Sequence, residues 1–154
     1  MSIDFAWKTP YHPQHSSDRG RVRMQGIEWI VEAQGCRAAD LRSLAALQEL
    51  FAAIIRDLDL HVVGEMRWHQ FPGSNGVTGF ALLSESHLAV HTFPEHQSLC
   101  LNLFCCRPRP NWDFVGELQV RLGADRVNVR RVERPYVADA DDVLRAMPVG
   151  EAVQ

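Results

Sequence analysis

The sequence predicts an α+β fold, a two-layer αβ sandwich in which an antiparallel sheet carries two helices on one face. Six segments cluster or alternate apolar residues as strands do, and two segments repeat them at helical spacing. Their order along the chain is β-α-β-β-β-β-α-β. The four strands in the middle of this order follow one another through short turns. Such turns join antiparallel neighbours and leave the helices to cover one face.

The first half of the chain supplies two strands and the longer helix. The first strand is expected over residues 24–35 and ends at Gly35. Large apolar residues then recur at helical spacing over 38–57. This pattern predicts an amphipathic helix with Asp40 in its first turn, where a negative charge suits the helix dipole. β-branched and aromatic residues predict a second strand over 58–71.

The second half completes the sheet and adds the shorter helix. A turn rich in proline and glycine follows the second strand, Pro94 opens another turn, and Gly123 caps the second helix. Between these signals, strands are expected over 77–84, 87–93, 98–106 and 127–132, and the second helix over 112–122.

The chain of 154 residues is expected to form one domain with its own core, over residues 24–134. Residues 1–23 lack periodicity and are predicted to form a flexible N-terminal arm. Residues 135–154 carry several aspartates and are predicted to form an acidic C-terminal tail.

The composition excludes several classes of function. Net charge is −3, hydrophobic residues make up 46% and charged residues 23% of the chain, as in ordinary globular proteins. The chain lacks the excess of basic residues that would indicate nucleic acid or an anionic membrane as a partner. No apolar run approaches the roughly 18 residues of a membrane span, and the N-terminus lacks the apolar core of a signal peptide. A cytoplasmic location is therefore expected.

The four cysteines are too sparse and irregular for a disulfide scaffold, and none forms a C-x-x-C pair typical of zinc sites. Cys105 and Cys106 are neighbours within one expected strand. Their side chains should lie on opposite faces, so that one packs and the other lies at a surface or a site.

Residues 83–95 are the densest cluster of reactive groups in the chain. They hold a Glu-Ser bond at Glu85 and Ser86, and two histidines, His87 and His91. Taken alone, Ser86 is most simply a turn serine and His91 a hydrogen-bonded strand residue. The two histidines alternate onto one face and suggest a metal pair with Cys106. No further ligand follows at regular spacing, so no metal site is expected.

The run from Ser84 to Glu95 reads Ser-Glu-Ser-His-Leu-x-x-His-Thr-x-Pro-Glu. It resembles the motif Ser-Glu-Ser-His-x-x-x-His-Thr-Trp-Pro-Glu of the small prokaryotic class of S-adenosylmethionine decarboxylase proenzymes. The segments 76–79, 103–106 and 69–71 are similar to Gly-Val-Ser-Gly, Leu-Phe-Thr-Cys and His-x-Phe segments of the same family. The resemblance extends over about residues 24–134, and its central motif is highly specific.

This resemblance implies that the chain cuts itself between Glu85 and Ser86 and that Ser86 becomes a covalent pyruvoyl group. The serine hydroxyl attacks the preceding carbonyl, and the resulting ester leaves by β-elimination. A pyruvoyl group forms a Schiff base with the substrate amine and accepts electrons during decarboxylation. The implied reaction converts S-adenosylmethionine to CO2 and an aminopropyl donor for spermidine synthesis.

The resemblance also implies the roles of individual side chains. His91 would be the processing base, Cys106 the catalytic proton donor, and Thr78 a hydroxyl that supports processing. Phe71 and Phe93 would stack on the adenine of the substrate. Glu95 would bind the ribose hydroxyls. The family fold is an αβ sandwich whose active sites lie at a dimer interface, so a homodimer is implied.

The chain departs from the family pattern mainly near the substrate pocket. Phe93 replaces a tryptophan, Asn102 an aspartate, Cys105 a threonine, and Arg107 a glycine, while Ile27 and Glu28 replace an Arg-His pair.

Two alternatives therefore remain open. One is a pyruvoyl-dependent arginine or ornithine decarboxylase of the same family. The other is a processing-dead homologue that acts as a regulatory or binding partner, which the intact Glu85–Ser86 bond, His91 and Cys106 argue against. Arg107 and Arg109 are most simply solvated loop charges, or they neutralise an acidic partner or a substrate carboxylate.

Overall fold

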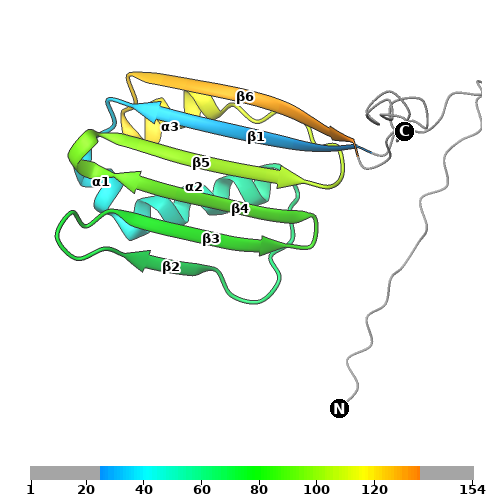
Figure 1. Ribbon diagram of the computed structural model, residues 1–154, viewed down its shortest axis with the longest axis horizontal. Helices are drawn as coiled ribbons and strands as arrows, with labels where there is room; N and C mark the ends of the chain where they lie inside the picture. The colour runs from blue at the N-terminus through cyan, green and yellow to red at the C-terminus, as the bar shows by residue number, and fades with distance from the viewer. Residues whose placement is uncertain (1–24, 136–154) are drawn as a thin grey trace, which may run out of the picture.

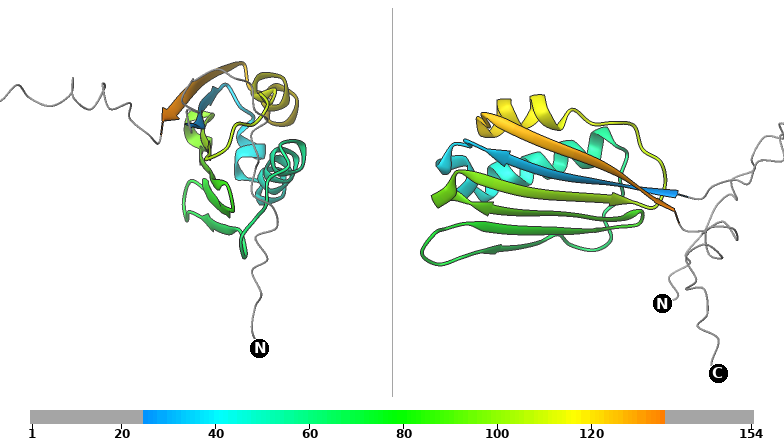
Figure 2. Two further views of the ribbon diagram at one scale, coloured as in Figure 1. Left: turned by 90° about the vertical axis from the view of Figure 1, so that its right-hand side faces the viewer. Right: turned by 45° about the horizontal axis from the view of Figure 1, so that its top comes forward.

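A computed structural model describes residues 25–135, which form a six-stranded antiparallel sheet with helices on one face (Figure 1). The edge-on view in Figure 2 shows the two layers, and the predicted fold class is confirmed. The strand order in the sheet is β2-β3-β4-β5-β1-β6. The strands are β1 Gln25–Gln34, β2 Arg67–Gln70, β3 Val77–Leu83, β4 Ser86–Phe93, β5 Ser98–Cys105 and β6 Arg126–Pro135. The helices are α1 Ala38–Arg42, α2 Leu44–Asp57, the short 3-10 helix η1 Pro94–His96 and α3 Phe114–Leu122.

Strand alternation divides the sheet into a covered face and an open face. On β4, Leu88, Val90 and Thr92 are buried toward the helices, whereas His91 and Phe93 are exposed on the other side. The helices lie behind the sheet in Figure 1, so the viewer looks onto the open face. The core between the layers holds the large side chains Trp29, Phe51 and Phe114 together with leucines from β4, β5, α2 and α3.

The helix predicted over 38–57 is interrupted at Ser43, and this part of the prediction is wrong. Ser43 is extended, with φ −83° and ψ 105°, and its hydroxyl accepts a hydrogen bond from the backbone N–H of Ala46 at 3.2 Å. A serine that satisfies a free N–H in this way begins a new helix. The chain therefore forms two helices, α1 and α2, where the apolar spacing predicted one.

The strand predicted over 58–71 is also wrong over most of its length. Only Arg67–Gln70 forms β2, and Val62 makes one isolated bridge to Leu83. Asp59 and Gly64 have φ values of 50° and 74°, which end regular extended structure. The apolar residues of this segment enter the core as a loop instead.

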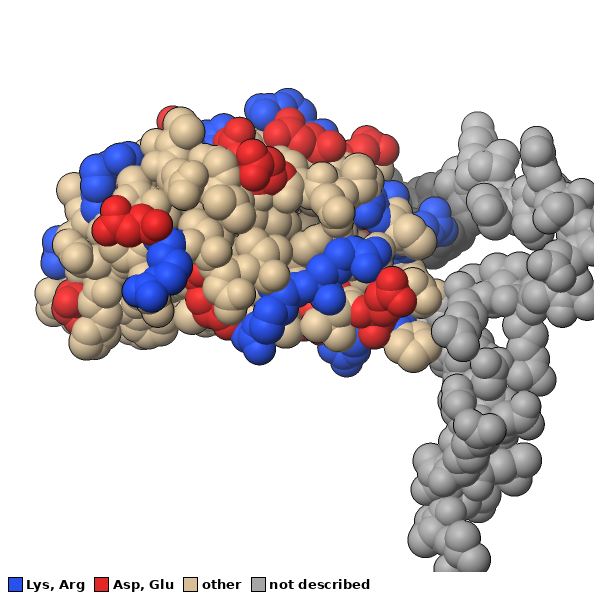
Figure 3. All heavy atoms as spheres, turned by 90° about the horizontal axis from the view of Figure 1, so that it is seen from above, with Lys and Arg blue, Asp and Glu red and all other residues tan. Residues whose placement is uncertain are grey.

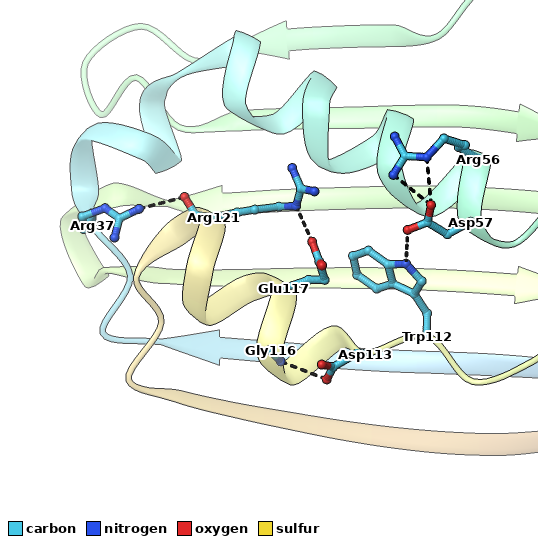
Figure 4. A network of polar contacts seen from close by, with 8 residues as sticks. All are labelled: Arg37, Arg56, Asp57, Trp112, Asp113, Gly116, Glu117 and Arg121. Carbon is cyan, nitrogen blue, oxygen red and sulfur yellow. Dashed lines mark hydrogen bonds and ion pairs between the residues drawn. The ribbon is translucent and has the colours of Figure 1, made fainter.

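The loop after β5 is held against α2 by polar contacts (Figure 4). The Trp112 indole N–H donates to the Asp57 carboxylate at 3.0 Å. Asp113 caps α3 by accepting from the N–H of Gly116 at 3.0 Å. These contacts fix the C-terminal end of the segment that follows Cys106.

Acidic and basic side chains are interspersed along the edge that carries β6, seen from above in Figure 3. Within residues 25–135, no helix is long and apolar enough to cross a membrane. The predicted arm over 1–23, and the predicted tail over 135–154 beyond Pro135, lie outside the described residues.

Candidate active site

The bond between Glu85 and Ser86 lies where a tight hairpin turn enters β4. Leu83 and Ser86 pair across the turn, so Ser84 and Glu85 alone connect β3 to β4. Ser86 has a φ of 156°, and residues with a side chain rarely adopt positive φ. The turn therefore places backbone strain at the bond that the sequence predicts to be cut.

The side chain of Glu85 is buried and held on both oxygens. Its carboxylate accepts from the His61 ring at 2.8 Å, from the His61 backbone N–H at 3.2 Å, and from the Arg109 guanidinium at 3.2 Å. Burial opposes ionisation, but the hydrogen bonds from His61 outweigh it and hold the pKa of Glu85 below its usual value. The residue before the Glu85–Ser86 bond is thus an anchored carboxylate.

The backbone carbonyl of Glu85 points at β5. It accepts a hydrogen bond of 2.8 Å from the backbone N–H of Cys106. An N–H directed at a carbonyl under attack stabilises the negative charge that develops on its oxygen. The structure therefore places the Cys106 N–H against the carbonyl of the Glu85–Ser86 bond.

The two neighbouring cysteines face opposite sides, as predicted. Cys105 is fully buried, and burial raises the pKa of its thiol to about 11. Cys106 is exposed beside the Glu85–Ser86 junction. Of these two thiols, only that of Cys106 is therefore accessible from outside the core.

A chain of hydrogen bonds leads away from Ser86 over the open face. The Ser86 hydroxyl lies 3.4 Å from Nδ1 of His87, and Nε2 of His87 lies 2.8 Å from Oδ1 of Asn102. The amide nitrogen of Asn102 donates to Glu28 at 2.8 Å, and Glu28 pairs with Arg134. Four neighbouring strands, β4, β5, β1 and β6, contribute to this chain of side chains.

His91 lies at the opposite end of β4. Its Nδ1 is 2.9 Å from the Thr78 hydroxyl, and the two residues pair across β3 and β4. His91 is five positions along the strand from Ser86, which corresponds to about 16 Å. The structure thus joins His91 to Thr78 and does not bring it to Ser86 of the same chain.

The three residues expected to bind substrate lie at the His91 end. Phe93 ends β4, Glu95 follows in η1, and both are exposed. Phe71 lies in the turn between β2 and β3 and stacks edge-on against His69, with ring centroids 4.6 Å apart. The residues expected to bind substrate therefore lie at one end of the open sheet face, and the Glu85–Ser86 bond lies at the other.

Sequence reasoning missed His61 and misjudged Arg109. Arg109 is no freely solvated loop charge, because its side chain is 20% exposed and pairs with Glu85. Each of the two residues lies 24 positions from Glu85, and no local pattern links residues so far apart. Among the described residues, no three His, Cys, Asp or Glu side chains are grouped to hold a metal ion.

Comparison with known proteins is consistent with this geometry. The model of the S-adenosylmethionine decarboxylase family matches residues 27–135. An S-adenosylmethionine decarboxylase proenzyme of Thermomicrobium roseum is 34% identical over 126 residues, which cover 77% of this chain and 100% of the relative. A proenzyme of Moorella thermoacetica is 30% identical over 117 residues, covering 75% of this chain and 92% of the relative.

A solved structure has the same fold. The crystal structure of the adenosylmethionine decarboxylase from Aquifex aeolicus superposes with a TM-score of 0.64 at 23% identity, covering 76% of this chain and 96% of that one. Fold and sequence together define a decarboxylase. The chain belongs to the S-adenosylmethionine decarboxylase family, and the resemblance seen in the sequence is confirmed.

Proposed function

We propose that the chain cuts itself between Glu85 and Ser86 and then decarboxylates S-adenosylmethionine with the pyruvoyl group made from Ser86. The product would serve as the aminopropyl donor in polyamine synthesis, in the cytoplasm. The observation that carries this proposal is the hydrogen bond of 2.8 Å from the Cys106 N–H to the Glu85 carbonyl, beside the hydroxyl of Ser86.

The first step is an acyl shift within the turn. The Ser86 hydroxyl oxygen bonds to the Glu85 carbonyl carbon, and the Cys106 N–H stabilises the negative oxygen. The bond from that carbon to the Ser86 nitrogen then breaks, and the nitrogen takes up the proton that the hydroxyl lost. The product is an ester between the two residues.

The second step releases the ester. A base removes the α-proton of Ser86, and Glu85 leaves with a new C-terminal carboxylate. The remaining dehydroalanine tautomerises to an imine, which water hydrolyses to the pyruvoyl group with loss of ammonia. Ser86 itself provides all three carbons of the pyruvoyl group. The junction therefore needs no separate pocket for a cofactor. When formed, this group supplies an electron sink for loss of CO2.

We infer that a homodimer completes the site. His91 lies about 16 Å from Ser86 of its own chain, too far to reach it. A twofold axis that stacks two open faces and reverses the strand direction brings His91 of the partner subunit to Ser86. Phe80, Leu82 and Phe93 are 40%, 49% and 40% exposed on this face, and such apolar residues favour an interface.

The same arrangement divides the substrate between two chains. Phe71, Phe93 and Glu95 would hold the adenosine part from one protomer. Cys106 of the other protomer, beside the group made from Ser86, would return a proton to the substrate carbon after CO2 leaves.

The test is the mass of the purified full-length chain. We expect two chains, residues 1–85 and 86–154, the second blocked at its N-terminus by the pyruvoyl group. Ser86→Ala should give one uncut chain without activity, and the neighbouring Ser84→Ala should cut normally. A wild-type chain that stays uncut under all conditions would exclude this function.

The substrate is tested by CO2 release from S-adenosylmethionine, arginine and ornithine under the same conditions. We expect release from S-adenosylmethionine. If CO2 is released only from arginine or ornithine, the proposed self-cleavage stands, but the proposed substrate is wrong.

A further inference from the structure

The hydrogen bonds around His87 fix which ring nitrogen faces Ser86. Glu28 is a carboxylate and can only accept, so the NH2 group of Asn102 must point toward it. The amide oxygen of Asn102 then faces Nε2 of His87 at 2.8 Å, and Nε2 must carry the hydrogen. In the neutral ring, Nδ1 is therefore bare and faces the Ser86 hydroxyl at 3.4 Å.

Glu28 is suited to its place at the end of this chain of bonds. The hydrogen bond from Asn102 holds the pKa of Glu28 below its usual value, although burial opposes the shift, and Arg134 adds to the lowering. Glu28 thus stays ionised and keeps the orientation of Asn102. Arg134 also lies over the Phe104 ring, 5.8 Å from its centroid.

Two aromatic rings hold the imidazole of His87 in position. Phe80 on β3 stacks on it with a centroid distance of 6.0 Å and an angle of 19° between planes. Phe104 on β5 packs on it at 6.1 Å and 57°. A ring packed in this way loses rotational freedom, so Nδ1 stays directed at Ser86. The distance of 3.4 Å is long for a hydrogen bond, as is common for catalytic groups before the reaction begins.

We propose that His87 is the general base for the acyl shift at Ser86, and that Asn102 and Glu28 position it. This inference rests on the self-cleavage proposed above. Nδ1 takes the proton from the Ser86 hydroxyl as the oxygen bonds to the Glu85 carbonyl carbon. The same proton passes to the Ser86 nitrogen as the peptide bond breaks, so His87 ends unchanged. His91 of the partner subunit remains for the later removal of the α-proton.

This division of labour predicts which intermediate accumulates when each histidine is removed. Hydroxylamine cleaves esters but leaves ordinary peptide bonds intact under mild conditions. His91→Ala should stop after the acyl shift and accumulate an ester that hydroxylamine cuts at residue 85. His87→Ala should cleave about 100-fold more slowly, the usual contribution of a general base, and hydroxylamine should not speed it.

The positioning residue is tested with a pair of variants. Asn102→Asp still accepts a hydrogen bond from Nε2 and should cleave within a few-fold of the wild-type rate. Asn102→Leu has a similar volume without the acceptor and should cleave about tenfold more slowly, roughly one order of magnitude less than the effect of losing the base itself. Added imidazole should restore part of the cleavage of His87→Ala, which a merely structural role would not predict. His96→Ala, an exposed histidine in η1, is the matched control and should cleave normally.

Each outcome has a definite meaning when thermal melting shows that the variants are folded. If the wild-type chain is uncut, the proposed function fails. If the wild type is cut and His87→Ala is cut equally fast, or gives an ester that hydroxylamine releases, the role of His87 is wrong and the proposed function stands. If His87→Ala does not fold, the Asn102 pair decides, because equal rates for Asp and Leu would also refute the role.

Discussion

The two ends of the open sheet face carry different chemistry. At one end, Ser86 is surrounded by side chains from its own chain, with His87 beside its hydroxyl and Cys106 across the bond to be cut. At the other end, His91 pairs with Thr78, two residues before Phe93 ends the strand. In Figure 1 these are the right and left ends of β4.

This difference indicates how the two ends of the face divide the steps of the proposed reaction. In the proposed reaction, the Ser86 end carries the groups for the acyl shift, and the His91 end would supply a base to the partner subunit. The strand cannot bring Ser86 and His91 of one chain together, because its extended backbone keeps them about 16 Å apart. In the proposed function, a second copy of the chain therefore supplies the opposite end.

The largest effect should come from mixing two inactive variants. His91→Ala alone should complete cleavage at least about 100-fold more slowly, because the base for the α-proton is missing. Coexpressed with Ser86→Ala, its intact Ser86 meets His91 of the partner subunit, and it should be cut at nearly the normal rate. Mass spectrometry of tagged chains measures this. Mixed dimers that leave the His91→Ala chain uncut would show that His91 acts within its own chain or elsewhere.

Separating the two copies should have a related effect. Leu82→Arg places a charge on the open face, where the side chain is 49% exposed in the protomer, and should give monomers in sedimentation analysis. These monomers should accumulate the ester that hydroxylamine cuts. Val120→Arg, at a residue 78% exposed on α3, should remain dimeric. Full cleavage by the Leu82→Arg monomer would contradict the division between the two ends.

Removing the thiol at the Ser86 end should separate cleavage from decarboxylation. Cys106→Ala keeps the backbone N–H that binds the Glu85 carbonyl, so self-cleavage should continue. Loss of the proton donor should lower kcat for CO2 release by about 100-fold. Cys100→Ala, also exposed, is the control for both assays. Equal CO2 release from wild type and Cys106→Ala would exclude the thiol from the reaction.

Changes at the pocket end should be smaller and should affect substrate binding. Phe93→Ala removes an exposed ring and should raise KM about fivefold to tenfold, the usual worth of an aromatic stack. Phe93→Trp should lower KM, because the larger ring covers more of the adenine. Steady-state rates of CO2 release measure both. An unchanged KM in both variants would remove Phe93 from the binding site.

The smallest expected effect concerns acid stability. The pKa of Glu85 is lowered in the folded chain, so its stabilisation is complete above the unfolded value, near 4.3, and is lost as pH falls through the folded value. In the uncut Ser86→Ala background, Glu85→Gln should cost on the order of 1 kcal/mol at pH 7. This difference should shrink below about pH 4. Thermal melting as a function of pH measures it, and a difference independent of pH would contradict the anchoring role.

Much of the fold follows from local pattern. The strands predicted over 87–93 and 98–106 correspond to β4 and β5, and the spacing of large apolar residues correctly predicted helix over most of 38–57. Ser43 shows the limit of this reasoning. Its backbone N–H closes the end of α1 on the Asp40 carbonyl and its hydroxyl caps the start of α2, which apolar spacing cannot reveal. The strand prediction failed over residues 58–66 because apolar loop residues that enter a core resemble strand residues in sequence.

The sequence alone predicts where the reactive junction lies, since Glu85, Ser86 and the neighbouring histidines lie within one short segment. The groups that surround this junction follow from the tertiary structure. Glu28, Asn102, His61 and Arg109 meet this segment through strand register and loop packing. The physical reason is that local periodicity depends on neighbours a few residues away. Contacts across a sheet depend instead on which strands pair and in what register, and the whole core decides that.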